Sequence, residues 1–300
     1  MNCRNLLILA SLSWSASPLV AQNWAPTAAP LTNWSSIASS ADGCRLVALG
    51  AGSTSFYAWP GPICVSTNGG MDWTTVAPLL DTGFPEPMVN WRSAASSAEG
   101  NRLFAVGEAP GDDGFALLIF QSTNGGALWT PAGTNMADSW IWVATSGDAR
   151  KVVAISTHPN GVFVSKDSGA TWTATPLAIS VGHAAWSADG TALVLAGADL
   201  ATSTNDGTTW FLAGLTNTTW ASVAASAEGS QLVAAESPGG IYTSTDHGRT
   251  WSATSAPTNY WTTLSSSADG KRLIAGAGGY RVTTGAIYTS NKFGGSLDFQ

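Results

Sequence analysis

The chain has 300 residues, of which 10% are charged and 44% are hydrophobic, with 33 glycines and 15 tryptophans. The hydrophobic content excludes a disordered chain, and the scarcity of Lys, Glu and Arg argues against surface helices. The net charge is −7 and basic residues form no cluster, which argues against a nucleic-acid or anionic-membrane partner.

The segment 1–21 has the features of a signal peptide. Arg4 precedes a short apolar stretch, Leu6–Leu12, and Leu19-Val20-Ala21 is an acceptable cleavage site. The stretch is too short to span a bilayer, and no later segment is long enough to insert into a membrane. A buried first strand is the alternative interpretation. We expect an exported protein, extracellular or periplasmic, in which residues 22–300 form one domain.

A segment beginning with Trp recurs along the chain. Its first copy is Trp34–Gly43, followed by Arg45-Leu-Val-Ala. The later copies begin at Trp91, Trp140, Val181, Trp220 and Trp261, and the last three intervals between copies are nearly equal. Internal similarity at such spacing indicates a fold built from six repeated units.

A second segment alternates with the first and places Ser, Asp or Asn, Gly and Trp at fixed spacing. The first copy is Ser66-Thr-Asn68-Gly-Gly70-Met-Asp-Trp73. Further copies begin at Ser122, Ser165, Ser203 and Ser244, and a degraded sixth begins at Ser290. Ser and Asx side chains can bond turn backbone, Gly accepts a positive φ, and Trp buries a large ring. We therefore expect structural turns, termed here Ser-Asx-Gly turns, and no metal ligands.

This second pattern resembles the Asp-box, or bacterial neuraminidase repeat. The repeat occurs in sialidases, sortilin-type receptors, xyloglucan hydrolases and photosystem II assembly factors, where it forms the turn between the third and fourth strands of a propeller blade. The resemblance covers almost all of residues 22–300 and implies a fold rather than a function.

Each repeat divides into four strands, which in the first repeat are expected at about 34–39, 45–50, 62–66 and 72–76. Asp42-Gly43 forms the turn between the first two strands, termed here the first turn. A four-stranded antiparallel unit repeated around an axis is a propeller blade. The sequence therefore predicts an all-β fold, a six-bladed β-propeller of four-stranded antiparallel blades.

The N-terminal strand is expected to close the ring. The sixth repeat lacks its fourth-strand Trp, whereas Trp24 stands alone before the first repeat. The interval from Trp24 to Trp34 equals the interval from Trp210 to Trp220. Residues 22–27 should therefore complete the sixth blade beside residues 285–290 and remove an exposed seam.

Two cysteines remain after export, Cys44 and Cys64, and both fall in the first blade. An oxidising compartment permits a disulfide. The repeat alignment does not place the two clearly opposite each other, so a bridge and two thiols both stay open.

Successive strands of a blade run in opposite directions. The loops between second and third strands and the loops between blades therefore lie on one face, termed the loop face. The first turns and the Ser-Asx-Gly turns lie on the opposite face, the turn face. In each blade a segment of chain connects the first turn to the Ser of the Ser-Asx-Gly turn. This segment is longer in blades six, one and two than in the other three blades; it covers 270–290, 43–66 and 100–122. The longest connection between blades joins blades one and two. The added chain therefore gathers on one arc of the loop face.

This loop arc contains our candidate ligand-binding residues. They are Tyr57, Trp59, Phe84, Glu86, Glu108, Asp112, Asp113, Phe115, Tyr280 and Arg281. Long loops on a rigid scaffold commonly carry function, although tolerated decoration is the alternative. The Trp residues that open the first strands should surround the channel mouth on the same face, and for them we favour packing over ligand contact.

A recognisable catalytic set is absent from the sequence. The resemblance to sialidases implies three converging arginines, but most arginines belong to the turn face, which leaves Arg92 and Arg281. The histidines lack metal-ligand spacing, and neither a phosphate-binding loop nor a nucleophile turn occurs. We expect no metal and no cofactor.

A glycosidase that uses two carboxylates stays open, because Glu86, Glu108, Asp112 and Asp113 supply enough acids. We favour a monomeric, non-catalytic binding or assembly module that recognises a carbohydrate, peptide or protein partner. A polysaccharide-active glycoside hydrolase is the alternative.

Overall fold

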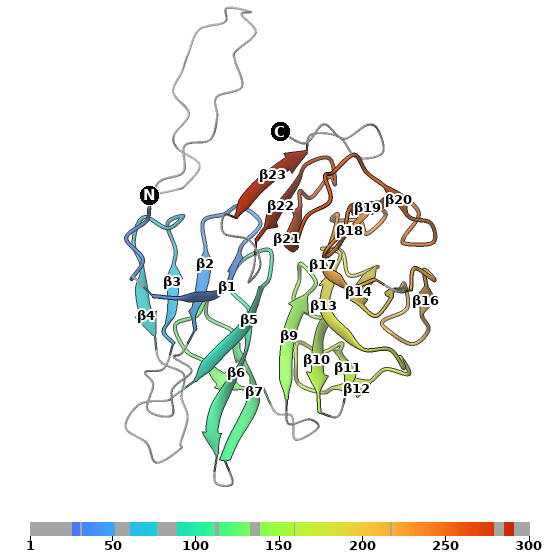
Figure 1. Cartoon of the computed structure of the whole chain (residues 1–300). Coiled ribbons are helices and arrows are strands. Elements are labelled where there is room, and N and C mark those ends of the chain that lie inside the picture. The colour runs from blue at the N-terminus through green and yellow to red at the C-terminus, as the bar shows by residue number, and fades with distance from the viewer. Residues whose placement is uncertain are drawn as a thin grey trace, which may run out of the picture.

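The structure, a computed structural model, describes residues 26–30, 32–51, 61–76, 89–111, 114–132, 139–158, 160–216, 218–278 and 285–290. These residues form strands and turns and contain no helix. The strands make six antiparallel sheets arranged as the blades of a β-propeller (Figure 1). The predicted fold class is therefore confirmed.

Within each blade the strands lie side by side in chain order, with the first strand innermost in the ring. Blades one to three contain β1 (Trp34–Ser39), β2 (Leu46–Gly50), β3 (Ile63–Ser66) and β4 (Thr74–Val76); β5 (Asn90–Ser96), β6 (Leu103–Gly111), β7 (Gly114–Ser122) and β8 (Thr130–Pro131); and β9 (Trp140–Thr145), β10 (Val152–Thr157), β11 (Asn160–Ser165) and β12 (Thr173–Ala174). Blades four to six contain β13 (Val181–Trp186), β14 (Leu193–Gly197), β15 (Leu200–Ser203) and β16 (Phe211–Leu212); β17 (Trp220–Ala225), β18 (Leu232–Glu236), β19 (Ile241–Ser244) and β20 (Ser252–Ala253); and β21 (Trp261–Ser266), β22 (Leu273–Ala277) and β23 (Ala286–Ser290).

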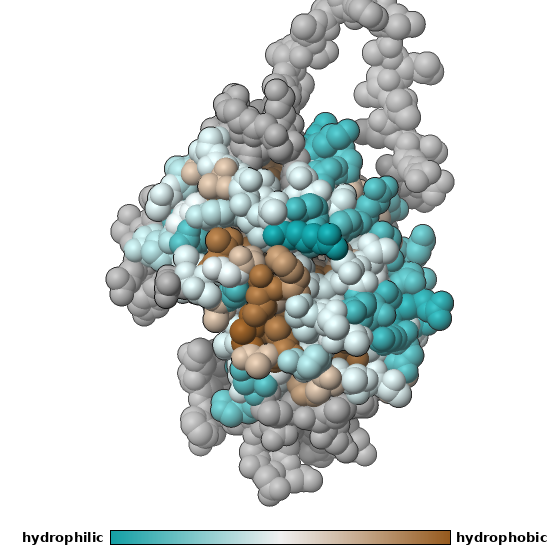
Figure 2. All heavy atoms as spheres, turned by 90° about the vertical axis from the view of Figure 1, so that its right-hand side faces the viewer, coloured by the Kyte–Doolittle hydropathy of each residue, from teal (hydrophilic) through white to brown (hydrophobic). Residues whose placement is uncertain are grey.

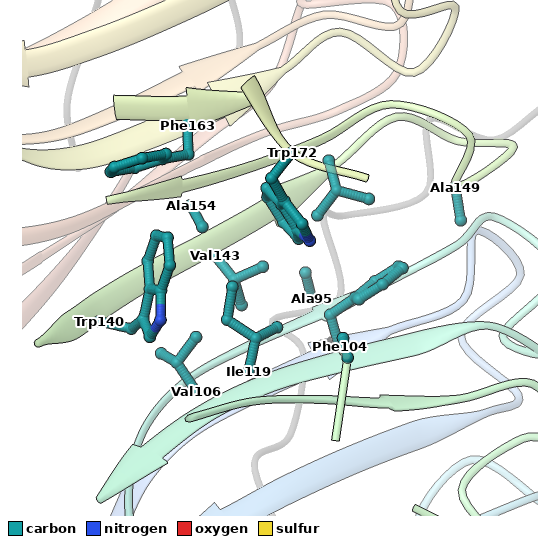
Figure 3. Packing of buried hydrophobic residues seen from close by; sticks show 12 residues of the cluster. Ala95, Phe104, Val106, Ile119, Trp140, Val143, Ala149, Ala154, Phe163 and Trp172 are labelled. Atoms are coloured by element: carbon teal, nitrogen blue, oxygen red, sulfur yellow. The ribbon is translucent and has the colours of Figure 1, made fainter. Parts of the chain in front are cut away.

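The hydrophobic core lies between the blades, where the faces of neighbouring sheets meet. Phe104 and Ile119 of blade two pack against Trp140, Val143 and Trp172 of blade three (Figure 3). Such contacts explain why second and third strands are apolar on both faces, since each blade is covered on two sides. The outermost strands are short and mostly exposed.

The Ser-Asx-Gly turns share one hydrogen-bond pattern. In blade three the Ser165 hydroxyl donates to Asp167 Oδ1 (2.8 Å), and Asp167 Oδ1 accepts from the Thr171 N–H (2.8 Å). The Gly169 N–H donates to Ser165 Oγ (2.8 Å), and Gly169 has a φ of 86°, which favours glycine. The turns of blades one, two, four and five repeat these bonds. The side chains therefore serve the turn, as predicted.

The two kinds of turn lie on the same face, also as predicted. In blade one the Gly69 N–H donates to the Cys44 carbonyl (2.9 Å), and in blade three the Ser168 N–H donates to the Arg150 carbonyl (2.9 Å). Because these bonds join the Ser-Asx-Gly turn to the first turn, the loops between second and third strands must lie at the opposite end of each blade.

Two of the five turns carry a titratable Asp in place of Asn. Hydrogen bonds from the Thr171 hydroxyl and N–H lower the pKa of Asp167 from 3.8 to about 2. At Asp246 burial alone would raise the pKa, but bonds from Thr250 and Ser244 outweigh it and lower the pKa to about 2. The ionised carboxylates therefore stabilise the fold above about pH 4, and this contribution is lost as the pH falls towards 2.

We expect the double variant Asp167→Asn, Asp246→Asn to lose less thermal stability than the parent between pH 4 and pH 2. Asn fits the turn, because Asn205 makes the equivalent bonds and its Nδ2 donates to Thr209 Oγ1 (2.8 Å). The measurement is the melting temperature by circular dichroism at several pH values. Parallel pH profiles for the two proteins would contradict this assignment.

Backbone bonds between first turns link successive blades from one to six. They join Ala41 to Ala98, Ala98 to Gly147, Gly147 to Ala188, Asp189 to Ala227 and Ala227 to Ala268 (2.7–2.9 Å). Among the described residues, no such bond joins the turns of blades six and one.

Strand β1 is correspondingly exposed on the side away from blade two. Trp34 is 40% exposed, whereas Trp91, at the same position of the repeat, is 2% exposed. Ile37 is 66% exposed. The seam between blades six and one is therefore the least covered part of the described ring.

The predicted closing strand falls largely outside the described residues. Residues 22–25 are not described, residues 26–30 carry no strand, and the sixth sheet has three described strands. Thr27 nevertheless lies beside Gly70, as Thr175 of blade three lies beside Gly207 of blade four. Thr27 and Thr175 each stand at the third position after a Trp. Closure by the N-terminal strand stays a prediction, and this placement supports it.

Cys44 and Cys64 are not joined by a disulfide. Cys64 is buried in β3 and pairs with Ala48. In four other blades the equivalent position holds an aromatic residue that packs on the Trp of the first strand: Phe120, Phe163, Tyr242 and Tyr288. Burial raises the pKa of the Cys64 thiol, which suits a packing residue rather than a nucleophile.

Candidate binding surface

The candidate residues of the loop arc are not tested by the structure. Glu108 and Phe115 lie in strands, but their side chains are outside the described part. The other eight lie outside the described residues: Tyr57, Trp59, Phe84, Glu86, Asp112, Asp113, Tyr280 and Arg281.

The added chain of blade two is a β-hairpin rather than an irregular loop. Strands β6 and β7 are equally long and stay paired from Leu103 opposite Ser122 to Gly111 opposite Gly114. The hairpin projects beyond the neighbouring blades at the bottom of Figure 1. Sequence reasoning missed it, although the apolar run 115–120 is a signal for a strand. The added chain of blade two is therefore a paired extension of its second and third strands.

The Trp residues that open the first strands are mostly unavailable to a ligand. Trp91, Trp140, Trp220 and Trp261 are between 0% and 3% exposed. The indole N–H of Trp91 donates to the Gly61 carbonyl (2.9 Å), which ties blade two to the connection between β2 and β3. The packing interpretation is confirmed for these four residues.

Two carboxylates of the loop face are described, Asp199 and Glu236. Asp199 is 4% exposed and accepts three backbone N–H bonds, from Leu200 (2.8 Å), Gly214 (3.0 Å) and Leu215 (3.1 Å). Glu236 accepts a bond from the Tyr242 hydroxyl (3.4 Å). Asp199 therefore organises its own blade, and its oxygens are already engaged.

The described histidines do not form a metal site. The ring centroid of His183 lies 4.4 Å from that of Trp142, and burial lowers the pKa of His183. Within the described part of the chain, no group of three His, Cys, Asp or Glu residues could hold a metal ion.

Five arginines lie in or beside the turns of the turn face, as the repeat predicts. Their backbone N–H groups are bonded within those turns: Arg45, Arg102, Arg150, Arg249 and Arg272. They are spread over five blades and do not converge on the loop face.

Among the described residues, no helix is long and apolar enough to cross a membrane.

The chain matches no protein-family model and no curated protein. Solved structures do match. A GH74 enzyme from Niastella koreensis has a TM-score of 0.65 at 15% identity over 89% of this chain and 46% of its own. A GH74 xyloglucanase from Xanthomonas campestris has a TM-score of 0.64 at 16% identity over 87% of this chain and 45% of its own. This chain spans about half the length of those two proteins.

YCF48 bound to a D1 peptide has a TM-score of 0.62 at 17% identity, over 91% of this chain and 81% of that chain. These similarities confirm the propeller fold. At such low identity they do not extend to the activity or partner of any one of these proteins.

Proposed function

We propose that the protein is a secreted, non-catalytic binding or assembly module that recognises a carbohydrate, peptide or protein partner through the loop arc. The projecting β6–β7 hairpin is the observation that carries this proposal, because it places the added chain of blade two on a regular support. YCF48, which is similar over most of its own length and is seen with a D1 peptide, is consistent with a single propeller that binds a peptide. We further propose that the Ser-Asx-Gly turns are Asp-box repeats, which their shared hydrogen bonds support.

A polysaccharide-active glycoside hydrolase is the second candidate, because two of the similar structures are GH74 enzymes. This function requires two carboxyl groups at a separation suited to inversion or retention. Of the two described loop-face acids, Asp199 is buried and bound by three amides, and Glu236 accepts a bond from the Tyr242 hydroxyl, so we propose that the two acids of such an enzyme lie in the loop arc.

The binding proposal predicts a separation between affinity and stability. Replacing Trp59 and Phe84 with Ala should abolish partner binding, because aromatic anchors contribute much of the energy of such interfaces. The melting temperature should change little. The measurement is a glycan and secreted-protein binding screen, followed by titration of any positive.

The control for this screen is the double variant Met71→Ala, Leu128→Ala, which removes exposed apolar side chains from the turn face. It should bind as the parent does. Binding that survives loss of Trp59 and Phe84 would show that the loop arc is decoration. Hydrolysis assays run on the same glycans address the enzyme, and turnover that disappears with Glu86→Gln or Glu108→Gln would establish the second candidate instead.

Export is the remaining part of the proposal. Cleavage near Ala21 should leave Gln22 or a neighbouring residue as the new N-terminus of the secreted protein, which intact-mass spectrometry would detect. Recovery of a cytosolic product that retains residues 1–21 would contradict it.

A further inference from the structure

A pocket of about 430 Å³ lies between blades four and five at the turn face. Blade four lines it with the end of β15 and with Thr209, Trp210 and Phe211. Blade five lines it with Asp246, His247 and Arg249 of its Ser-Asx-Gly turn. This volume lies within the range of pockets that hold small ligands.

The equivalent groove between blades three and four is crossed by an ion pair. Lys166 Nζ lies 3.5 Å from Asp206 Oδ2, and Lys151 Nζ lies 2.6 Å from Asp206 Oδ1. In the next groove the repeat replaces Lys166 with Thr204 and Asp206 with His247. Neither side chain can rebuild the pair, so the groove stays open.

Two lining residues depart from the repeat. Phe211 is 46% exposed and directly follows the Trp of its turn. In the other turns the residue after the Trp is Thr74, Thr130, Thr173 or Ser252. Arg249 stands where the other turns have Met71, Ala127, Ala170 and Thr208. A hydrophobic patch occupies the side of the molecule on which β16 lies (Figure 2), and Phe211 and Leu212 of β16 are exposed. An aromatic surface and a cation therefore meet in one pocket.

The carboxylate of Asp246 in the pocket is already engaged by its own turn. Asp246 is engaged by the Thr250 N–H (2.9 Å), the Thr250 hydroxyl (2.7 Å) and the Ser244 hydroxyl (2.8 Å). Within the described residues Arg249 forms no salt bridge. His247 Nδ1 and Trp210 Nε1 are buried without a partner there. The guanidinium of Arg249 therefore remains to pair with a ligand, and its geometry suits a carboxylate.

We propose that this pocket binds a single uronate sugar. The pyranose ring packs on Phe211, the carboxylate pairs with Arg249, and the hydroxyl groups of Thr204 and Thr209 face those of the sugar. A lining rich in hydroxyl groups favours a sugar over the apolar side chain of a peptide. The site lies on the face opposite the loop arc and stands independently of the function proposed above.

Saturation-transfer NMR on the full secreted chain tests this site with glucuronate and glucose as probes. Glucuronate should bind at least about tenfold more tightly than glucose, because a hydrogen bond to a charged group contributes enough for that factor. Arg249→Ala should abolish the difference. Phe211→Thr installs the residue of the neighbouring blades and should weaken both sugars without loss of folding.

The ion pair of the preceding groove provides a matched test. Thr204→Lys combined with His247→Asp rebuilds the Lys166–Asp206 pair in this groove and should abolish glucuronate binding. Lys166→Thr alters the preceding groove, where Lys151 still pairs with Asp206, and should leave glucuronate binding unchanged. Equal binding of glucose and glucuronate, undiminished binding in the rebuilt or Phe211→Thr variants, or tighter binding of N-acetylphenylalanine, a peptide-like carboxylate, would each overturn the proposal.

Discussion

Deleting residues 22–30 should destabilise the entire ring rather than a single blade. The described residues leave β1 uncovered, with Ile37 66% exposed, and provide no turn-to-turn bond between blades six and one. Thr27 lies beside Gly70 of blade one, just as Thr175, which follows a fourth-strand Trp, lies beside Gly207 of blade four. If Trp24 fills the fourth strand of blade six, its loss removes the contact that joins the two ends of the chain.

The expected loss is at least that of removing one buried Trp side chain, about 3–5 kcal/mol of unfolding free energy. Denaturant unfolding gives this value, and hydrogen exchange should show raised exchange in all six blades. Trp24→Ala alone should reproduce most of the effect. A truncated protein that unfolds at the parent's midpoint, or loses protection in one blade alone, would refute closure by the N-terminal strand.

Replacing Trp140 with Ala should cost about 3–5 kcal/mol of unfolding free energy. The side chain is fully buried, and its ring centroid lies 5.0 Å from that of Phe163 in an edge-to-face contact and 6.1 Å from that of Trp172 (Figure 3). The indole nitrogen has no hydrogen-bond partner among the described residues. The loss therefore reports packing within blade three and against blade two rather than a broken hydrogen bond.

Trp34→Ala is the matched control, because Trp34 has the same place in the repeat but is 40% exposed. Its cost should be smaller than that of Trp140→Ala, since less apolar surface returns to water. Trp140→Phe should retain part of the stability lost in Trp140→Ala. Equal losses at Trp34 and Trp140 would contradict the difference in burial on which this prediction depends.

The six-bladed fold could be read from the sequence because its determinants are local and repeated. A Ser, an Asx and a Gly at fixed spacing specify one turn whichever blade contains it, as the shared bonds of Ser165, Asp167 and Gly169 and their equivalents show. The Trp at the start of a first strand likewise indicates a buried position that recurs in most blades. Repetition of these signals gave the number of blades and the strand order.

The sequence predicted the candidate site less completely than it predicted the fold. Loop lengths located an arc of added chain, but they did not distinguish an irregular loop from the paired hairpin of β6 and β7, because pairing depends on the register of both strands. The individual residues of the loop arc, among them Trp59 and Phe84, stay predictions.

The sequence by itself determined the repeat, the turns and the face on which each connection lies, since these follow from short-range turn chemistry and strand parity. Only the tertiary structure decided which side chains meet across a groove. Lys166 and Asp206 belong to different repeats and become partners because neighbouring blades pack face to face. The same packing leaves Thr204 and His247 without such a pair and opens the pocket beside Phe211 and Arg249. Contacts between blades depend on the twist and spacing of whole sheets, which no single repeat encodes.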